Sequence, residues 1–338
     1  MTLNTNTYTE WGIHLRSLAT VFMVMLHVAA SAIYQHPIES STWCIANFYD
    51  SLSRFCVPIF IMLSGTFMLN KNYTLDSTFI KTKIMRLFYP FLVWSLFYAL
   101  LNLKATIYDG KPLNAIESIQ FILYQLYQGS SFHLWYMYLI FFLYLTLPTL
   151  SQLLRTSPEK RYLLFFIFWF LSIFICQFIW SPFAYFPGYL GYLVLGYYLS
   201  KSSLRGKKAA ISLYLIGCCI TFIGTYVAST QQGHFSELFY NFLTLNVLIS
   251  SIGLYVFVKN IHIKNPVLIY ISKAIAANSF GIYLCHVIIL RLFVKIGIDY
   301  HFIHPLVGIP LTSVLAIAAS WLLVFCLQKL PFGNYLVG

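Results

Sequence analysis

The sequence has little charge for its length. Only 9% of its 338 residues are Asp, Glu, Lys or Arg, and 59% are hydrophobic. In a soluble globular domain about 25% of residues are charged. A chain of this composition cannot cover itself with a hydrated surface. A water-soluble enzyme, a secreted disulfide scaffold and a single-span anchored domain are therefore excluded, and we expect a polytopic integral membrane protein.

Patterned cysteine is also missing. The seven cysteines include no C-x-x-C pair and no Cys/His spacing typical of a zinc site. Six of them lie inside apolar runs, where a thiol behaves as a small buried hydrophobic group. We therefore expect neither a disulfide framework nor a metal site.

Ten apolar runs are long enough to cross a membrane, because about 20 helical residues span the hydrocarbon core. They cover residues 15–34, 48–69, 85–103, 133–150, 162–179, 183–199, 209–228, 238–258, 274–294 and 305–327. Residues 114–128 are less apolar and predict an amphipathic helix at the membrane interface. The sequence thus predicts an all-α protein with about ten transmembrane helices, organised as a single membrane-embedded domain over residues 1–338.

Lysine and arginine indicate the orientation. Sixteen of the 21 lie at the chain ends or at loops that follow even-numbered spans, and four lie on the other side. Because cytoplasmic loops are rich in Lys and Arg, both termini are expected in the cytoplasm. The net charge of +12 reflects this asymmetry, and no nucleic-acid partner is expected. Only Arg54 is left unexplained by orientation.

The first span carries two ionisable residues on one face. Arg16 and His27 are eleven residues apart, or three helical turns plus about 20°, with a rise of roughly 16 Å. Arg16 then lies at the cytoplasmic end and His27 near mid-membrane. Such groups are costly in a membrane unless they face protein or water, so both are functional candidates. The alternatives are an orientation-setting arginine and a buried histidine bonded to backbone.

The second span carries an arginine beside a predicted kink. Asn47 and Arg54 share a helix face, and Asp50 can pair with Arg54 at a spacing of four residues. Pro58 removes the hydrogen bond that the Arg54 carbonyl would accept and favours a kink there. Arg54 is therefore a functional candidate, and a purely structural pair with Asp50 is the alternative.

Small and basic residues mark the cytoplasmic ends of spans. Ser64 and Gly65 would let a ligand or a helix approach closely. Lys83 and Arg86 form a basic pair, which positive-inside topology explains as well as a phosphate clamp does.

Histidines and aromatic residues mark the outer ends. His133, Trp135 and Tyr136 open the fourth span, although a membrane-interface belt alone could supply the last two. Tyr283 and His286 share one face of the ninth span. Sorted by depth, the polar groups suit a phosphate-bearing donor from the cytoplasm and a sugar-like acceptor from outside.

Four motifs in this order resemble the bacterial acyltransferase 3 family of membrane proteins. They are Arg16-x10-His27, the run WCIAN through SRFCVPIFIMLSG over residues 43–65, HLW at 133–135, and SFGIYLCH at 279–286. The resemblance covers nearly the whole chain. It implies an inner-membrane enzyme that moves an acyl group, usually acetyl, from cytoplasmic acyl-CoA to a hydroxyl of a cell-envelope glycan.

The resemblance also implies roles for residues. The family's arginine and histidine of the first helix fall on Arg16 and His27, and its R-x-x-R pair falls on Lys83 and Arg86. Lysine keeps the charge but lacks the bidentate fork of arginine. We expect acyl-CoA, a substrate and not a bound cofactor, to be held by Arg16, Ser64, Gly65, Lys83 and Arg86.

The catalytic hypothesis rests on His27 and Arg54. A histidine with an ordinary pKa of about 6.5 can accept the proton of a sugar hydroxyl, and Arg54 can stabilise an oxyanion or orient His27. An acyl-histidine intermediate stays open. We expect the acceptor to be bound by Asn47, His133, Trp135, Tyr136, Tyr283 and His286.

A second class of function is compatible with the same spans. Buried Arg and His residues also occur in transporters or flippases for anionic glycolipids and in glycan polymerases. Transporters often show paired broken helices in two repeats, which the sequence does not reveal, and a polymerase would call for a large basic outer loop. We therefore expect an acyltransferase whose partners are acyl-CoA, a glycan or glycolipid acceptor, and membrane lipids.

Overall fold

The computed structural model describes residues 10–156, 159–176 and 182–338, and within them all regular structure is helical. The helices are α1 (Glu10–Gln35), α2 (Ser41–Ser53), α3 (Cys56–Met68), α4 (Ser77–Phe79), α5 (Met85–Tyr108), α6 (Ala115–Gln128), α7 (Trp135–Thr156), α8 (Glu159–Cys176), α9 (Pro182–Lys201), α10 (Lys207–Gln232), α11 (Leu245–Lys259), α12 (Pro266–Ala277), α13 (Ser279–Lys295), α14 (Pro305–Gln328) and α15 (Gly333–Val337). A π turn, η1 (Ile80–Ile84), and two 3-10 turns, η2 (Phe132–Leu134) and η3 (Leu238–Tyr240), complete them.

Seven helical stretches of the described residues are long and apolar enough to cross a membrane. They are Glu10–Gln35, Ser41–Met68, Ser77–Tyr108, Phe132–Arg155, Lys207–Gln232, Leu238–Lys259 and Pro305–Gln328. The pair α12 and α13 makes an eighth if it counts as one span. The spans expected at 162–179 and 183–199 coincide with α8 and α9, and the end of the first lies outside the described residues. The predicted all-α, polytopic fold is confirmed.

One predicted span is wrong in detail. The run 274–294 is not one straight helix, because it breaks at Asn278 and α12 and α13 meet at 79°. The Asn278 amide donates to the Ala274 carbonyl at 2.8 Å, and asparagine favours helix ends because its side chain competes for backbone groups. The span predicted at 238–258 matches Leu238–Lys259, which begins with the 3-10 turn η3 and continues as α11 from Leu245, after a local turn in which Asn241 accepts the Leu243 amide at 2.9 Å.

The predicted kink in the second span is present. The helix stops at Ser53, turns through Arg54 and resumes as α3, with Pro58 in its first turn. The span begins earlier than expected because Ser40 caps α2 by accepting the Trp43 amide at 3.2 Å. Arg54 therefore occupies a helix junction, where its side chain is not confined to one helix face.

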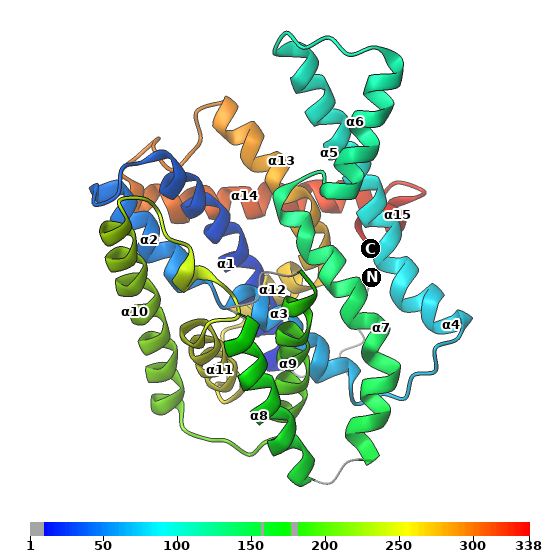
Figure 1. Cartoon of the computed structure of the whole chain (residues 1–338), viewed down its shortest axis with the longest axis vertical. Helices are drawn as coiled ribbons and strands as arrows, with labels where there is room; N and C mark the ends of the chain where they lie inside the picture. Colours follow the sequence, from blue (N-terminus) through cyan, green and yellow to red (C-terminus); the bar gives the residue numbers. More distant parts are fainter. Residues whose placement is uncertain (1–9, 157–158, 177–181) are drawn as a thin grey trace.

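The predicted amphipathic helix is α6. Asn114 and Glu117 form a reciprocal capping box at its start, and none of its residues is buried. Helices α5 and α6 project together as a hairpin from the end of the bundle shown at the top of Figure 1. In the predicted orientation, with both termini in the cytoplasm, this end would face outward.

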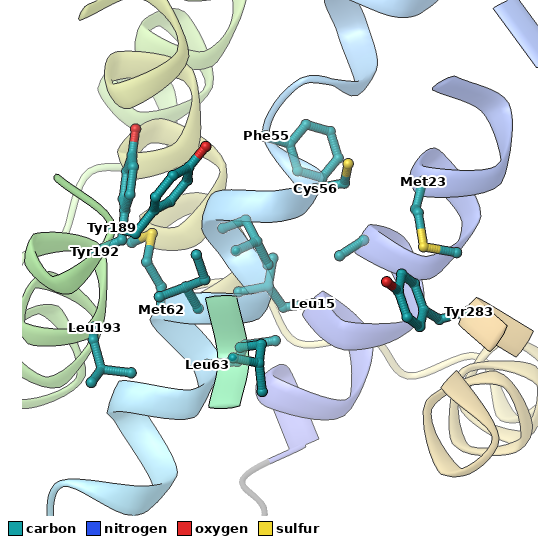
Figure 2. Packing of buried hydrophobic residues seen from close by; sticks show 14 of the residues in the cluster. Leu15, Met23, Phe55, Cys56, Met62, Leu63, Tyr189, Tyr192, Leu193 and Tyr283 are labelled. Atoms are coloured by element: carbon teal, nitrogen blue, oxygen red, sulfur yellow. The ribbon is translucent and has the colours of Figure 1, made fainter. Parts of the chain in front are cut away.

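The core forms where α1, α3 and α9 meet. Figure 2 shows Leu15 of α1, Met62 and Leu63 of α3, and Tyr192 of α9 in this packing. Helices α3 and α9 can approach closely because Gly65 has no side chain. A Cβ atom at this position would lie 1.7 Å from the Leu193 carbonyl oxygen. Helix α1 also packs against α2 and α11 to α14, so its polar residues face protein.

Candidate active site

Three histidines from separate elements meet inside the helical bundle. The His27 ring stacks on His286 with centroids 5.1 Å apart, and His133 of η2 approaches His286 edge-on at 5.1 Å. His286 is 0% exposed and His133 is 2% exposed, whereas His27 is partly exposed. The break at Asn278 aims α13 toward α1 and η2, which brings these residues together.

The backbone fixes the tautomer of His286. Its Nδ1 donates to the Tyr283 carbonyl at 2.7 Å, so in the neutral ring Nε2 carries the lone pair. Nδ1 of His133 lies 3.1 Å from the Ser131 hydroxyl, and the Tyr283 hydroxyl donates to the His133 carbonyl at 2.6 Å. Within the described part of the chain, Nε2 of His133 and of His286 has no hydrogen-bond partner. Of the two, His133 lines a cavity, whereas His286 is fully buried and lines none of the cavities described below.

Arg54 is held by three interactions. Its Nε donates to the buried Asp50 carboxylate, which confirms the predicted pair. One terminal nitrogen donates to the Tyr240 carbonyl at 3.2 Å, and the guanidinium carbon lies 3.9 Å from the centre of the Tyr240 ring. The pair has a structural role, yet 13% of the arginine side chain stays exposed and faces the cavities described next.

Two cavities open around Arg54. The larger, of about 1080 Å³, is the aromatic cavity, and the second, of about 670 Å³, is the α13–α14 cavity. Both are lined by Tyr34, Arg54, Trp135, Glu237 and Phe242. The aromatic cavity adds the rings of Tyr127, Tyr138, Phe142, Phe186, Tyr189 and Tyr240. The α13–α14 cavity adds His27, Arg291 and Asp299 among apolar residues.

A third, small cavity of about 50 Å³ lies behind His27, and we call it the inner cavity. His133, Tyr136 and Tyr283 line it, together with Met23, which lies about one turn before His27 in α1. His27 therefore borders both the inner and the α13–α14 cavity. Trp135 lines all three cavities and stacks on Phe242, with centroids 6.0 Å apart.

Asn47 does not line these cavities and stands behind Arg54 instead. Its amide nitrogen donates to the Phe222 carbonyl at 3.1 Å, and its oxygen accepts the Tyr240 hydroxyl at 2.6 Å. Tyr240 in turn holds Arg54. The structure therefore places Asn47, predicted to bind acceptor, in a network that supports the site.

The predicted donor residues are spread out. Arg86 lines a separate cavity of about 700 Å³ between α5 and α15, where Tyr89 meets Tyr335 at 5.4 Å. Lys83 does not line that cavity, but Lys81 does. The π turn η1 accounts for the presence of Lys81 in place of Lys83, because its wider turn aligns Lys81 with Arg86. Arg16 does not line it either.

Ser64 and Gly65 lie in a helix contact. Gly65 packs against the α9 backbone, and the Ser64 hydroxyl donates to the Phe60 carbonyl at 3.0 Å. Neither residue lines the cavity of Arg86 or the inner cavity.

Sequence reasoning missed Lys81 and Glu237. Helical periodicity of 3.6 residues places Lys83, not Lys81, on the same face as Arg86. Lys81 was missed because the sequence does not reveal the π turn. Glu237 lies in the loop before η3, outside every motif, and its position against Tyr34 and Trp135 depends on packing. No group of three His, Cys, Asp or Glu among the residues that the structure describes could hold a metal ion.

Comparison with known families gives one match. The family model described as an acyltransferase domain matches residues 10–325, nearly the whole chain. The chain therefore belongs to the acyltransferase 3 family and is a multi-pass membrane acyltransferase. Searches of curated proteins and of solved structures gave no match.

Proposed function

We propose that this chain moves an acyl group, in the first place acetyl, from cytoplasmic acyl-CoA to a hydroxyl of a cell-envelope glycan or lipid-linked sugar at the bacterial inner membrane. One observation carries the proposal. His27 borders both the inner cavity and the α13–α14 cavity. A donor in one cavity and an acceptor in the other would both reach this imidazole.

In the proposed reaction the acceptor oxygen attacks the thioester carbonyl carbon while His27 takes the hydroxyl proton. The carbon–sulfur bond then breaks, and the proton passes from His27 to the CoA thiolate, which leaves as free CoA. Arg54 stabilises the charge that develops on the carbonyl oxygen, and its ion pair with Asp50 holds it in place beforehand. A covalent acyl-His27 variant would transfer the same atoms in two steps.

The acceptor is proposed to bind across the outer cavities. Trp135, which lines all three cavities, offers an aromatic face to a sugar ring, and Tyr136, Tyr283 and His133 line the adjoining inner cavity, where they can meet the hydroxyl that is acylated. His286 lines none of these cavities and would act on the acceptor through His27, against which it stacks. The stretches 42–65 and 132–136 look most like those of the O-acetyltransferase that decorates enterobacterial common antigen. That polysaccharide is the acceptor to test first.

The donor is proposed to bind from the cytoplasmic side. Arg86 and Lys81 supply two cations in the cavity between α5 and α15, where the nucleotide phosphates would bind. Arg16 and Lys83 remain in the proposed donor path, whereas Ser64 and Gly65 are assigned to the contact between α3 and α9. The inner cavity is too small for an acyl-pantetheine arm, so donor binding requires it to widen.

A coupled assay tests the proposal. Purified protein in lipid nanodiscs receives acetyl-CoA and enterobacterial common antigen glycolipid, and free thiol and acceptor mass are followed. An acyltransferase releases one CoA for each acceptor that gains an acetyl group. A flippase or polymerase would act on the glycolipid without releasing CoA, and that result would refute the proposal.

A further inference from the structure

Glu237 occupies a place in the site that no role above explains. Its side chain lines both the aromatic and the α13–α14 cavity. The Tyr34 hydroxyl donates to its Oε1 and is its one side-chain hydrogen-bond partner among the described residues. The ion pairs within 4.0 Å in the described ranges are Arg54 with Asp50 and His301 with Asp299, so the Glu237 carboxylate has no cation beside it.

The aromatic cavity is lined by few charged side chains. Of the described residues that line it, Arg54 and Glu237 are the charged ones. The Arg54 cation is paired with Asp50, which is fully buried behind it. Glu237 is exposed, so the cavity presents a second, accessible carboxylate beside aromatic rings and the amides of Gln128 and Asn241.

We propose that Glu237 determines acceptor specificity by requiring a neutral sugar in the aromatic cavity. The inference rests on the proposed function, in which that cavity takes the acceptor glycan. The carboxylate accepts hydrogen bonds from sugar hydroxyls or an acetamido N–H, while the rings cover the apolar faces of the sugar. A uronic acid in the same position would place two carboxylates together, and such juxtaposed like charges select strongly against a ligand.

Binding without donor tests this directly. Wild-type protein in nanodiscs is titrated with methyl β-glucoside and with methyl β-glucuronide, which differ only at C6, and saturation-transfer NMR reports binding. The test variant is Glu237→Gln, which keeps the shape and removes the charge. The matched control is Glu39→Gln, because Glu39 lies at the same outer end, contacts Thr230 and Tyr226, and does not line either outer cavity.

We expect the wild type and Glu39→Gln to bind the glucoside at least about tenfold more tightly than the glucuronide. Glu237→Gln should bring the two within about twofold, mainly by improving glucuronide binding. Equal binding of both by wild type, no binding of the glucoside, or an unchanged preference in Glu237→Gln would overturn the inference. Improved glucuronide binding cannot come from unfolding, so a misfolded variant does not mimic the expected result.

The two proposals fail separately. If wild type acetylates an acceptor yet binds the two glycosides alike, the specificity inference alone is wrong. If the glycosides are discriminated as expected but no acetyl-CoA is consumed with any acceptor, the proposed function is wrong and the sugar site stands.

Discussion

The imidazole of His286 lies against that of His27, with ring centroids 5.1 Å apart and 25° between the ring planes. His286 is fixed by its Nδ1 bond to the Tyr283 carbonyl, so it presents a rigid surface to the proposed base. The contact joins α1 to α13 at the point where the cavities meet.

Replacing His286 should therefore impair the chemical step. His286→Ala leaves His27 free to turn away, and we expect kcat to fall at least about tenfold with the KM for acetyl-CoA nearly unchanged. Steady-state kinetics of CoA release measure both. His14→Ala is the control, since His14 is also a buried histidine but lies near the N-terminal end of α1. Equal kcat values for the two variants would contradict a positioning role.

Asp50→Asn should destabilise the fold and weaken catalysis together. It leaves the Arg54 cation without its partner, and removing one member of a buried pair costs about 3–5 kcal/mol. Thermal unfolding in nanodiscs and CoA release are the measurements. The double variant Asp50→Asn with Arg54→Gln should regain part of the stability and none of the activity. Full activity in either variant would argue against Arg54 as the oxyanion partner.

Substitution by alanine should have different effects on stability at Gly65 and at Ser64. A methyl group at Gly65 would meet the Leu193 backbone, so Gly65→Ala should cost about 3 kcal/mol or more and reduce the folded yield. Ser64→Ala loses only a bond to a helix carbonyl and should keep the Tm within a few degrees. If Ser64→Ala instead weakens CoA binding severalfold in calorimetry, these residues contact the donor as the sequence predicts.

Lys81 should matter more than Lys83 for the donor. Lys81→Ala removes a cation from the cavity that Arg86 lines, and we expect the KM for acetyl-CoA to rise about tenfold, equivalent to about 1.4 kcal/mol. Lys83→Ala should raise it less than threefold. Removing the phosphates tests the cause, because acetyl-pantetheine should not distinguish the two variants. The reverse order of KM values would restore Lys83 as the phosphate ligand.

The sequence predicts what depends on neighbours along the chain. The Arg54–Asp50 pair, the kink before Pro58 and the amphipathic helix near residues 114–128 all follow from patterns over short stretches of sequence, and all are present. The family match over residues 10–325 confirms the resemblance that the four motifs carried.

Features that depend on packing escaped prediction. Nothing in a helical pattern shows that the helix breaks at Asn278 and that α13 continues at 79° to α12, yet this break directs His286 to His27. The π turn at Ile80–Ile84 shifts the basic face from Lys83 to Lys81. Asn47 is expected on the same helix face as Arg54, but it does not line the cavities that Arg54 lines, and its amide donates to the Phe222 carbonyl of α10.

The role of His27 is tested most directly by His27→Ala in nanodiscs with acetyl-CoA and the glycolipid acceptor. CoA release should fall at least about a hundredfold, because a positioned general base contributes about 10²–10⁴-fold to the rate. Binding of CoA measured by calorimetry, and the Tm, should match those of wild type and of the His14→Ala control. Turnover within tenfold of wild type in a folded, CoA-binding His27→Ala protein would contradict the proposed site.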